Sequence, residues 1–513
     1  MKMKKIIYMA AIFGAALSFT GCDDTINIFP VGNNTADQFY QTEFELKQAV
    51  MGIYARLGRN GTNTDFPTDF YLQSSEGRSD NWYSASIPNA QRDQCDLRYF
   101  QVTDATSLNQ TNYGRLYQVI KEANNLLEKA PETYERFRAE ASFLRAFAYF
   151  ELVRAYGPQP VVTRPITNTE AKPLTRQPAT DVYAQVISDL EFAANTLDDF
   201  YTDDDTGRVG AIAAKCLMGQ VYVTMAGYPL NDATAYAKAE TVLGSIMNTV
   251  KARFAPAYAD IFDVNKENLY DLFSIQFASG GQNVGSSMAG YITTSGGSST
   301  SFPEWAYAGH SQQGQDFRID SLLIKQMDDV DDLRLETSLA RGFWNTVKHG
   351  YTAEDSAKYY IERDILVKYL VKDNTNATIK SWNDYPLNYP VLRAADAYLL
   401  YAEALVNNNK ASQAKEWVDA IRERAGLAPL AADPTMNDIM YERRCEFLGE
   451  GKRYFDLVRM GETTFVSTLK AFSDQYEHVK LLGANNPDKR DMLLPIPRTV
   501  TSIHTSWDQN YGY

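Results

Sequence analysis

The sequence has few of the residues on which most catalytic and metal centres depend. Its 513 residues include only 4 histidines and 4 cysteines. It contains no H-E-x-x-H, no C-x-x-C, no G-x-S-x-G and no phosphate-binding glycine loop. These absences argue against zinc proteases, thiol redox proteins, serine hydrolases and nucleotide-binding enzymes. We therefore expect a protein that is not an enzyme and that uses no cofactor and no metal.

The cysteines do not form a disulfide framework either. Apart from Cys22, which is discussed below, they are Cys95, Cys216 and Cys445. This is an odd number, and the spacing suits neither paired disulfides nor zinc ligands. We expect these three side chains to be small buried hydrophobic groups.

Positive charge is also in deficit. Lysine and arginine number 50 against 64 aspartates and glutamates, which gives a formal charge of -14 at pH 7. Such a protein is a poor partner for a nucleic acid or an anionic membrane surface. An uncharged ligand suits it better.

Long apolar runs are missing as well, and the one run present is too short to span a bilayer stably. Three lysines precede an apolar run from Ile6 to Leu17, and small residues then lead to Cys22. This order predicts a signal peptide over residues 1–21. Small residues before a cysteine resemble the lipobox of bacterial lipoproteins, in which the cysteine is acylated and becomes the mature N-terminus. We expect a lipid anchor at Cys22, followed by a polar tether.

Most of the remaining chain shows the periodicity of paired helices. An apolar stripe runs from Leu392 to Val406, three asparagines interrupt it, and a second stripe runs from Ala414 to Ala425. Similar patterns predict helices over 39–57, 113–127, 181–197, 210–225 and 233–250. Paired helices of this kind resemble tetratricopeptide repeats, which bury a face only by stacking on a neighbour. The sequence predicts a mainly α-helical array of about four pairs, three within 39–250 and the last at 390–426.

Residues 251–389 lack this pattern and are predicted to form a loop-rich insert. Residues 268–277 alternate enough for one short strand. Six glycines and six serines then occur within residues 280–301, which predicts a flexible loop. The aspartates at 328–332 are typical of a solvated turn, because the glycine and distal glutamate of a calcium loop are absent. An irregular stretch over 58–110 is long enough to indicate a functional or disordered loop.

The last part of the chain, 434–513, begins with a strongly charged helix and ends in a closing tail. The helix is predicted to start at Asp433 and Pro434. From Glu442 to Arg459, acids and arginines alternate with large apolar groups. Unpaired charges in such surroundings would be costly to bury, so we expect ion pairs that tie helices together. An anion site built from the arginines is the alternative.

Two motifs and the C-terminal tail carry a resemblance to a known family. The early stretch, from Ala139 to Gly157, matches one of its motifs closely, and the tail from Pro495 to Tyr513 looks like its C-terminus. The late charged stretch fits the patterns E-R-R-x-E-[LF], E-G-x-R and D-L-x-R at Glu442, Arg443, Arg444, Glu446, Phe447, Glu450, Gly451, Arg453, Asp456, Leu457 and Arg459. The sequence resembles the SusD/RagB outer-membrane nutrient-binding lipoproteins of Bacteroidetes.

This resemblance implies a single SusD-like unit over residues 22–513 and a function for it. Asp23 and Asp24 resemble the signal that sends such lipoproteins to the cell surface. The resemblance implies that the protein captures oligosaccharides there and delivers them to a SusC-like TonB-dependent outer-membrane transporter. Peptides or another nutrient are the alternative cargo. An all-helical glycoside hydrolase, whose paired carboxylates would be invisible in the sequence, and a helical-repeat adaptor for proteins are the alternative functions.

Carbohydrate binding requires flat apolar faces beside hydrogen-bonding groups, and two loop regions offer both. In the family, ligand-binding aromatic residues come from loops at about these two places. We expect Trp82 and Trp305 to make the main contacts. Trp344 and Trp382 are weaker candidates, and Trp417 is predicted to be a core residue. The full predicted site comprises Arg78, Asp80, Asn81, Trp82, Tyr83, Tyr291, Trp305 and Tyr307.

Overall fold

The structure is a computed structural model. It describes residues 39–59, 63–84, 96–292, 317–344, 360–372, 377–476 and 487–513. The predicted signal peptide, Cys22, Cys95, Trp305 and Tyr307 lie outside the described residues.

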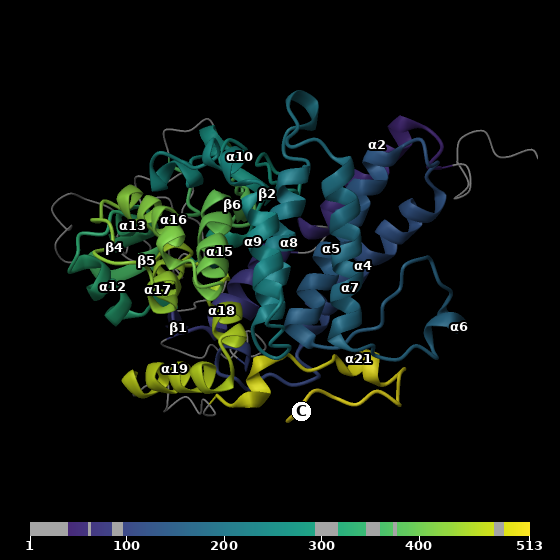
Figure 1. The fold of residues 1–513 in the computed structure, drawn as a ribbon. Coiled ribbons are helices and arrows are strands. Elements are labelled where there is room, and N and C mark those ends of the chain that lie inside the picture. Colours follow the sequence, from purple (N-terminus) through teal and green to yellow (C-terminus); the bar gives the residue numbers. More distant parts are fainter. Residues whose placement is uncertain are drawn as a thin grey trace, which may run out of the picture.

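Four helical pairs dominate the described part of the chain, which confirms a mainly α-helical array. Each pair packs helix on helix, and successive pairs stack side by side (Figure 1). The fourth pair packs directly on α8 and α9, although the insert separates them in the sequence. The pairs are α2 (Glu43–Leu57) with α4 (Ser107–Lys129), α5 (Glu135–Tyr156) with α7 (Ala179–Thr196), α8 (Ala211–Ala226) with α9 (Ala235–Gly244), and α15 (Ala394–Asn407) with α16 (Ala411–Arg424).

Small side chains let these helices approach closely. Every residue of α5 from Ala139 to Tyr156 is buried, which requires neighbours on all sides. In α8, a Cβ atom added at Gly219 would collide with the Leu243 side chain of α9. Dense packing of this kind explains why alanine and glycine recur on the buried faces.

The insert and the connecting segments add short helices and three two-stranded antiparallel sheets within the described residues. The sheets pair β1 with β3, β2 with β6, and β4 with β5. The strands are β1 (Trp82–Ser84), β2 (Asp271–Ile275), β3 (Phe317–Ile319), β4 (Leu339–Trp344), β5 (Tyr360–Leu366) and β6 (Tyr389–Arg393). The short helical segments before the C-terminal region are η2 (Pro67–Ser75), η3 (Glu76–Arg78), α6 (Asn168–Ala171), η4 (Asp203–Asp205), α10 (Met247–Lys251), η5 (Tyr258–Phe262), η6 (Val264–Lys266), α11 (Met288–Ile292), α12 (Ser321–Asp328) and α13 (Arg334–Ser338).

The C-terminal segment runs along one edge of the array, seen in yellow in Figure 1. It comprises α17 (Met436–Glu446), α18 (Arg453–Arg459), α19 (Glu462–Gln475), η8 (Lys489–Met492) and α21 (Arg498–Thr501). Among the described residues, most buried apolar side chains form one cluster, which extends from Leu46 to Ile496. Trp417 belongs to this cluster with 6% of its surface exposed, as predicted.

Three predicted helix boundaries were wrong. Residues 389–393 form strand β6 rather than the first turn of a helix, and α15 begins at Ala394. Short apolar runs do not distinguish a buried strand from a buried helix. The charged helix begins after Thr435, whose side chain accepts a hydrogen bond from the Asp438 N–H and so caps the helix. The helix predicted over 233–250 is divided between α9 and α10.

The largest difference from the sequence-based expectation concerns the stretch predicted as a loop over 58–110. All residues from Asp65 to Trp82 are buried. They form η2, η3 and the start of β1, and they lie against the helical array and the C-terminal segment. A stretch rich in polar residues is therefore part of the interior.

Candidate functional site

Four residues of the predicted site lie inside the protein. Arg78 is 0% exposed, Asp80 4%, Asn81 1% and Trp82 2%. Arg78 lies between the rings of Phe100 and Tyr454, with its guanidinium carbon 4.7 Å from the Tyr454 centroid, and it donates to the Asp491 carbonyl oxygen at 2.8 Å. These contacts are structural, and a ligand contact by Arg78 stays a prediction.

Asp80 and Asn81 are also engaged by the protein itself. Arg453 Nε donates to Asp80 at 2.7 Å, and Arg444 Nε donates to the Asn81 side-chain oxygen at 2.9 Å. Burial alone would raise the pKa of Asp80, but Arg444 and Arg453 outweigh burial and lower that pKa. Asp80 therefore carries a charge that its partners neutralise. Ligand contacts by Asp80 and Asn81 likewise stay a prediction.

Arg444 ties together two segments far apart in the sequence. Its Nη2 donates to the Asp80 carbonyl oxygen at 2.6 Å and to the Asp320 carboxylate at 3.0 Å. Asp80 precedes β1, and Asp320 follows β3 directly. Sequence reasoning assigned Arg444 to an ion pair, but its partner segments could not be identified without the fold.

The predicted aromatic residues occupy three different environments. Trp82 pairs with Ile319 in the β1–β3 sheet. Tyr83 is half-buried, and its ring centroid lies 4.1 Å from that of Tyr476. Tyr291, in α11, is 4% exposed and lies 5.6 Å from the half-buried Trp382. Trp305 and Tyr307 follow α11 and precede β3 in the sequence, outside the described residues.

The charged segment forms a buried cluster, called the ionic hub below. Arg393 donates to Glu446 at 2.5 Å and to Glu450 at 2.9 Å, and Lys368 donates to Glu450 at 2.8 Å. These contacts confirm the predicted ion pairs between elements. The hub consists of Arg334, Lys368, Arg393, Arg424, Glu442, Glu446 and Glu450.

Opposite charges balance one another throughout the hub. Burial alone would raise the pKa of Glu446, but Arg424, Arg393 and Arg334 outweigh it and hold that pKa well below its usual range. The pKa of Glu450 is lowered by Arg393 and Lys368, also against the effect of burial. The guanidinium groups of the nearby signature arginines likewise meet carboxylates. This pairing favours the structural interpretation over the alternative of an anion site.

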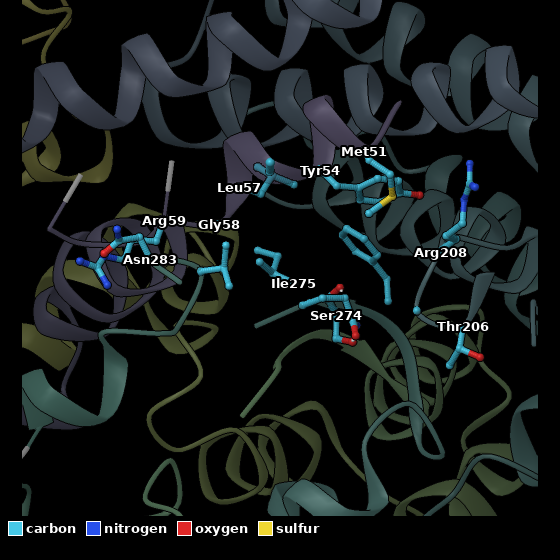
Figure 2. A pocket seen from close by; sticks show the side chains of 15 residues that line it. Met51, Tyr54, Leu57, Gly58, Arg59, Thr206, Arg208, Ser274, Ile275 and Asn283 are labelled. Atoms are coloured by element: carbon cyan, nitrogen blue, oxygen red, sulfur yellow. Dashed lines mark hydrogen bonds between the residues drawn. The ribbon is translucent and has the colours of Figure 1, made fainter. Parts of the chain in front are cut away.

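A pocket of about 430 Å³ lies elsewhere, between α2, the residues before α8, β2 and the loop before α11 (Figure 2). Its lining includes Met51, Arg59, Thr206, Ile275 and Asn283. Sequence reasoning missed it, because four segments distant in the sequence form its walls. Two of its residues, Asn283 and Val284, do fall in the stretch predicted as a glycine- and serine-rich loop.

Within the described ranges, no group of three or more histidine, cysteine or acidic residues could hold a metal ion. None of the described helices is long and apolar enough to cross a membrane. Cys216 and Cys445 are buried and free, as expected for small hydrophobic side chains.

Comparison with known proteins identifies the family that shares this architecture. Residues 159–513, well over half of the chain, match the SusD family. The chain belongs to the SusD family. An overlapping match covers residues 33–223 and is described as starch-binding associating with outer membrane. The resemblance inferred from the early and late motifs is confirmed.

Relatives of this SusD-family chain match it over nearly its full length. A SusD-like protein of Bacteroides ovatus is 26% identical over 93% of this chain and 86% of its own. The SusD-like protein P2 of Formosa agariphila is 26% identical over 97% of each chain. Among solved structures, a SusD homologue from Bacteroides thetaiotaomicron has a TM-score of 0.75 at 20% identity, covering 93% of this chain and 98% of the other.

Two further solved structures have names that include a ligand. A laminarin-binding SusD-like protein has a TM-score of 0.73 at 24% identity, covering 92% of this chain and all of the other. Surface glycan-binding protein A from Bacteroides thetaiotaomicron, in complex with laminarihexaose, has a TM-score of 0.74 at 18% identity, covering 91% and 99%. At these identities the likeness establishes the fold alone.

Proposed function

We propose that this SusD-family protein binds an oligosaccharide at the cell surface and passes it, uncleaved, to a SusC-like TonB-dependent outer-membrane transporter. Family membership supports the proposal. So do the names of similar proteins, one of which binds laminarin while another forms a complex with laminarihexaose. An uncharged glycan also suits a chain with a formal charge of -14.

The observation that supports the proposal is that the described segments on either side of residues 293–316 lie near the first aromatic region. α11, which holds Tyr291, packs against η2. β3 begins at Phe317 and pairs with β1, which holds Trp82 and Tyr83. The chain that carries Trp305 and Tyr307 therefore leaves and returns beside the segment that contains the first region.

We assign ligand contact to Tyr83, Trp305 and Tyr307. Trp82 and Tyr291 are 2% and 4% exposed, so we assign them a supporting role in the site. Arg78, Asp80 and Asn81 support the site through their contacts with the C-terminal segment. Aromatic rings suit such a site, because they offer a large flat apolar surface to the C–H face of a sugar ring.

The absence of cleavage is part of the proposal. Hydrolysis by two carboxylates needs one group that can donate a proton and another that is free to act on the sugar. Two buried carboxylates at or near the first region, Glu76 and Asp80, are already bound by the protein. Glu76 accepts hydrogen bonds from the Gly449 and Gly451 N–H groups, and Asp80 is paired with Arg453. This engagement supports binding over catalysis.

Calorimetry and affinity electrophoresis against a panel of polysaccharides, with a peptide mixture as a separate arm, test the proposal. We expect affinities of about micromolar to millimolar, or roughly 4–8 kcal/mol, because transport requires release. Trp305→Ala and Tyr307→Ala should each weaken glycan binding at least about tenfold. Phe44→Ala, at a residue 70% exposed on α2, is the matched control and should bind like the wild type.

Three outcomes would contradict the proposal in different ways. Release of reducing sugar by the purified protein would show that it is a hydrolase. Binding of peptides in place of glycans would reassign the cargo. Unchanged glycan binding by both Trp305→Ala and Tyr307→Ala would disprove the site and leave the function intact.

The lipid anchor and the transporter partner are tested separately. Cys22→Ala should abolish acylation and release the protein from the outer membrane when it is expressed without its transporter. Co-purification of the wild-type protein with a TonB-dependent barrel would support the partner. Unchanged membrane partitioning of Cys22→Ala would disprove the anchor.

A further inference from the structure

The pocket beside α2 lies outside every residue of the predicted site. Its volume of about 430 Å³ falls within the range of small-molecule sites, which is roughly 300–1,000 Å³. Figure 2 shows how it is built: α2 supplies one wall, β2 supplies the facing wall, and polar side chains lie at the two ends.

The two facing walls are largely apolar. Met51 and Leu57 line the α2 side, and Ile275 lines the β2 side (Figure 2). Leu57 and Ile275 belong to the core and are 1% and 4% exposed, whereas Met51 and Val284 are 47% and 49% exposed. The mouth of the pocket thus presents apolar groups that are partly open to water.

Each end of the pocket carries a polar side chain that is free to bind. Asn283 lies at one end with Arg59, and Thr206 lies at the other with Arg208 (Figure 2). Within the described part of the chain, neither the Asn283 amide nor the Thr206 hydroxyl has a hydrogen-bond partner. An amide and a hydroxyl at opposite ends can both donate and accept hydrogen bonds.

Charge in the pocket favours a neutral ligand. Arg208 donates to both oxygens of Glu140, at 2.8 and 2.7 Å, and to Asp205 at 3.0 Å, so its charge is neutralised. Arg59 donates to the Asn383 carbonyl oxygen at 2.8 Å. None of the described residues that line the pocket is an aspartate or glutamate. An anion would find no uncompensated cation at Arg208, and a cation would find no carboxylate.

The pocket is preformed rather than loosely packed. The Gln276 amide in its wall is held by Asn268, Ser274 and Asn388, at 2.9, 2.7 and 2.8 Å. Gly207 has a φ of 86°, and a Cβ atom there would lie 2.7 Å from the Gln276 side chain. Such a wall needs little rearrangement when a ligand binds, which lowers the entropic cost of binding.

We propose that this pocket is a second carbohydrate site, which takes one or two rings of a neutral sugar. The ligand class rests on the proposed function, while the geometry supplies the fit. A sugar ring has apolar C–H faces, which suit the facing walls of Met51 and Ile275. Its hydroxyl groups lie around its rim, where Asn283, Arg59 and Thr206 can reach them. A purely apolar ligand would leave these polar ends desolvated without partners, which is costly.

Contacts between described residues link the pocket to Tyr291 of the predicted site. Arg59 binds the carbonyl oxygen of Asn383, and the preceding residue, Trp382, lies against Tyr291. Asn283 and Tyr291 belong to the same short stretch of chain.

The test blocks the pocket without touching the principal site. Ala55 is an exposed residue of α2 that lines the pocket, so Ala55→Trp fills it from a position that loses no packing. Ala237→Trp, at an exposed alanine of α9 away from the pocket, is the matched control. Asn283→Asp replaces the amide with a negatively charged carboxylate, which can accept hydrogen bonds but cannot donate them. Calorimetry and hydrogen–deuterium exchange are measured with laminarihexaose and maltohexaose, in wild type and in a Trp305→Ala background.

We expect the probe that binds to protect residues 51–58 and 280–284 from exchange in wild type and in Trp305→Ala. Ala55→Trp should remove this protection, and Asn283→Asp should weaken the residual binding of Trp305→Ala at least fivefold. Ala237→Trp should show the same glycan binding and the same protection from exchange as the protein into which it is introduced. The second site would be overturned if Trp305→Ala abolished glycan binding, Ala55→Trp left it unchanged, and α2 showed no protection from exchange. This result would leave the proposed function standing. No binding of any carbohydrate by the wild type would overturn both.

Discussion

The ionic hub and the pocket beside α2 both combine polar side chains with apolar ones, but they use them in opposite ways. In the hub, Glu446 and Glu450 are 0% exposed and accept from several cations. In the pocket, Asn283 and Thr206 are exposed and have no partner within the described part of the chain. The difference separates structural polar groups from those available to a ligand, because a buried polar group must be paired, whereas an exposed one can exchange water for a ligand.

The same criterion explains what happened to the first predicted binding region. Asp80 and Asn81 have the chemistry of sugar-binding residues, yet Arg444 and Arg453 already occupy them. Residue type alone does not reveal whether a polar group is already bound. Each of the following changes tests one side of this comparison.

The largest effect should come from breaking the hub. Arg393→Ala removes the cation between Glu446 and Glu450 and leaves two buried carboxylates poorly compensated. We expect the free energy of unfolding to fall by about 3–5 kcal/mol, measured by urea denaturation. Arg341→Ala is the matched control, since its pairs with Asp328 and Asp364 are solvent-exposed and should contribute no more than about 1 kcal/mol. Equal losses in the two variants would refute the structural role of the hub.

A smaller effect should follow from removing the link between β1 and β3. Arg444→Ala deletes the hydrogen bonds to Asn81 and Asp320, and we expect a loss of about 1.5–3 kcal/mol in the free energy of unfolding. Hydrogen exchange should increase at residues 80–84 and 317–320. The exposed Arg498, paired with Asp104, offers a control in Arg498→Ala. If exchange rose uniformly across the chain, Arg444 would have no specific role in holding the two strands.

Glu267 is intermediate between these two kinds of polar group. Its largely buried carboxylate accepts a hydrogen bond from the Asn388 backbone N–H at 2.7 Å. It has no salt bridge among the described residues. Burial raises the pKa of Glu267 to about 7. Between about pH 4.5 and 7 the folded state therefore holds a proton that the unfolded state has released, so this group lowers stability as pH rises through that window.

Glu267→Gln should remove this pH dependence. We expect the variant to be more stable than wild type by about 1 kcal/mol at pH 7.5, with the gain vanishing below about pH 4.5. Denaturation curves at several pH values measure it. Glu132→Gln, at an exposed glutamate, is the control, and its stability should depend on pH in the same way as that of the wild type. A gain that persists unchanged at pH 4 would contradict the assigned cause.

The smallest effect should come from the pocket. Asn283→Asp alters a side chain without a partner in the described structure, and we expect a change below about 0.5 kcal/mol in the free energy of unfolding. Asn112→Asp is the contrasting variant, because Asn112 is 0% exposed and donates to Ser74 Oγ at 2.9 Å. For Asn112→Asp, the free energy of unfolding should fall by more than about 2 kcal/mol. A similar cost for both variants would remove the distinction between the two regions.

Sequence reasoning succeeded where the deciding interactions are local. The helical pairs follow from apolar spacing within single helices such as Leu392 to Val406, although the strand β6 at its start was missed. The ion pairs of the charged segment follow from a local argument as well, since charges among large apolar groups require partners. Family membership was predicted from two continuous motifs.

The candidate site depends on contacts that the sequence does not encode locally. Asp80 meets Arg453 across 373 positions of the chain, and Arg59 meets Asn383 across 324. The polar composition of residues 65–82 predicts exposure, but the helical array and the C-terminal segment pack against these residues and bury them. The pocket beside α2 likewise exists only because four separate segments meet.

The sequence by itself determined the helical array, the need for buried ion pairs and the membership of the SusD family, because periodicity, charge in apolar surroundings and continuous motifs are properties of neighbouring residues. Only the tertiary structure decided which polar side chains are already paired and which remain open to a ligand. That distinction depends on burial, and burial of any one residue is set by segments hundreds of positions away.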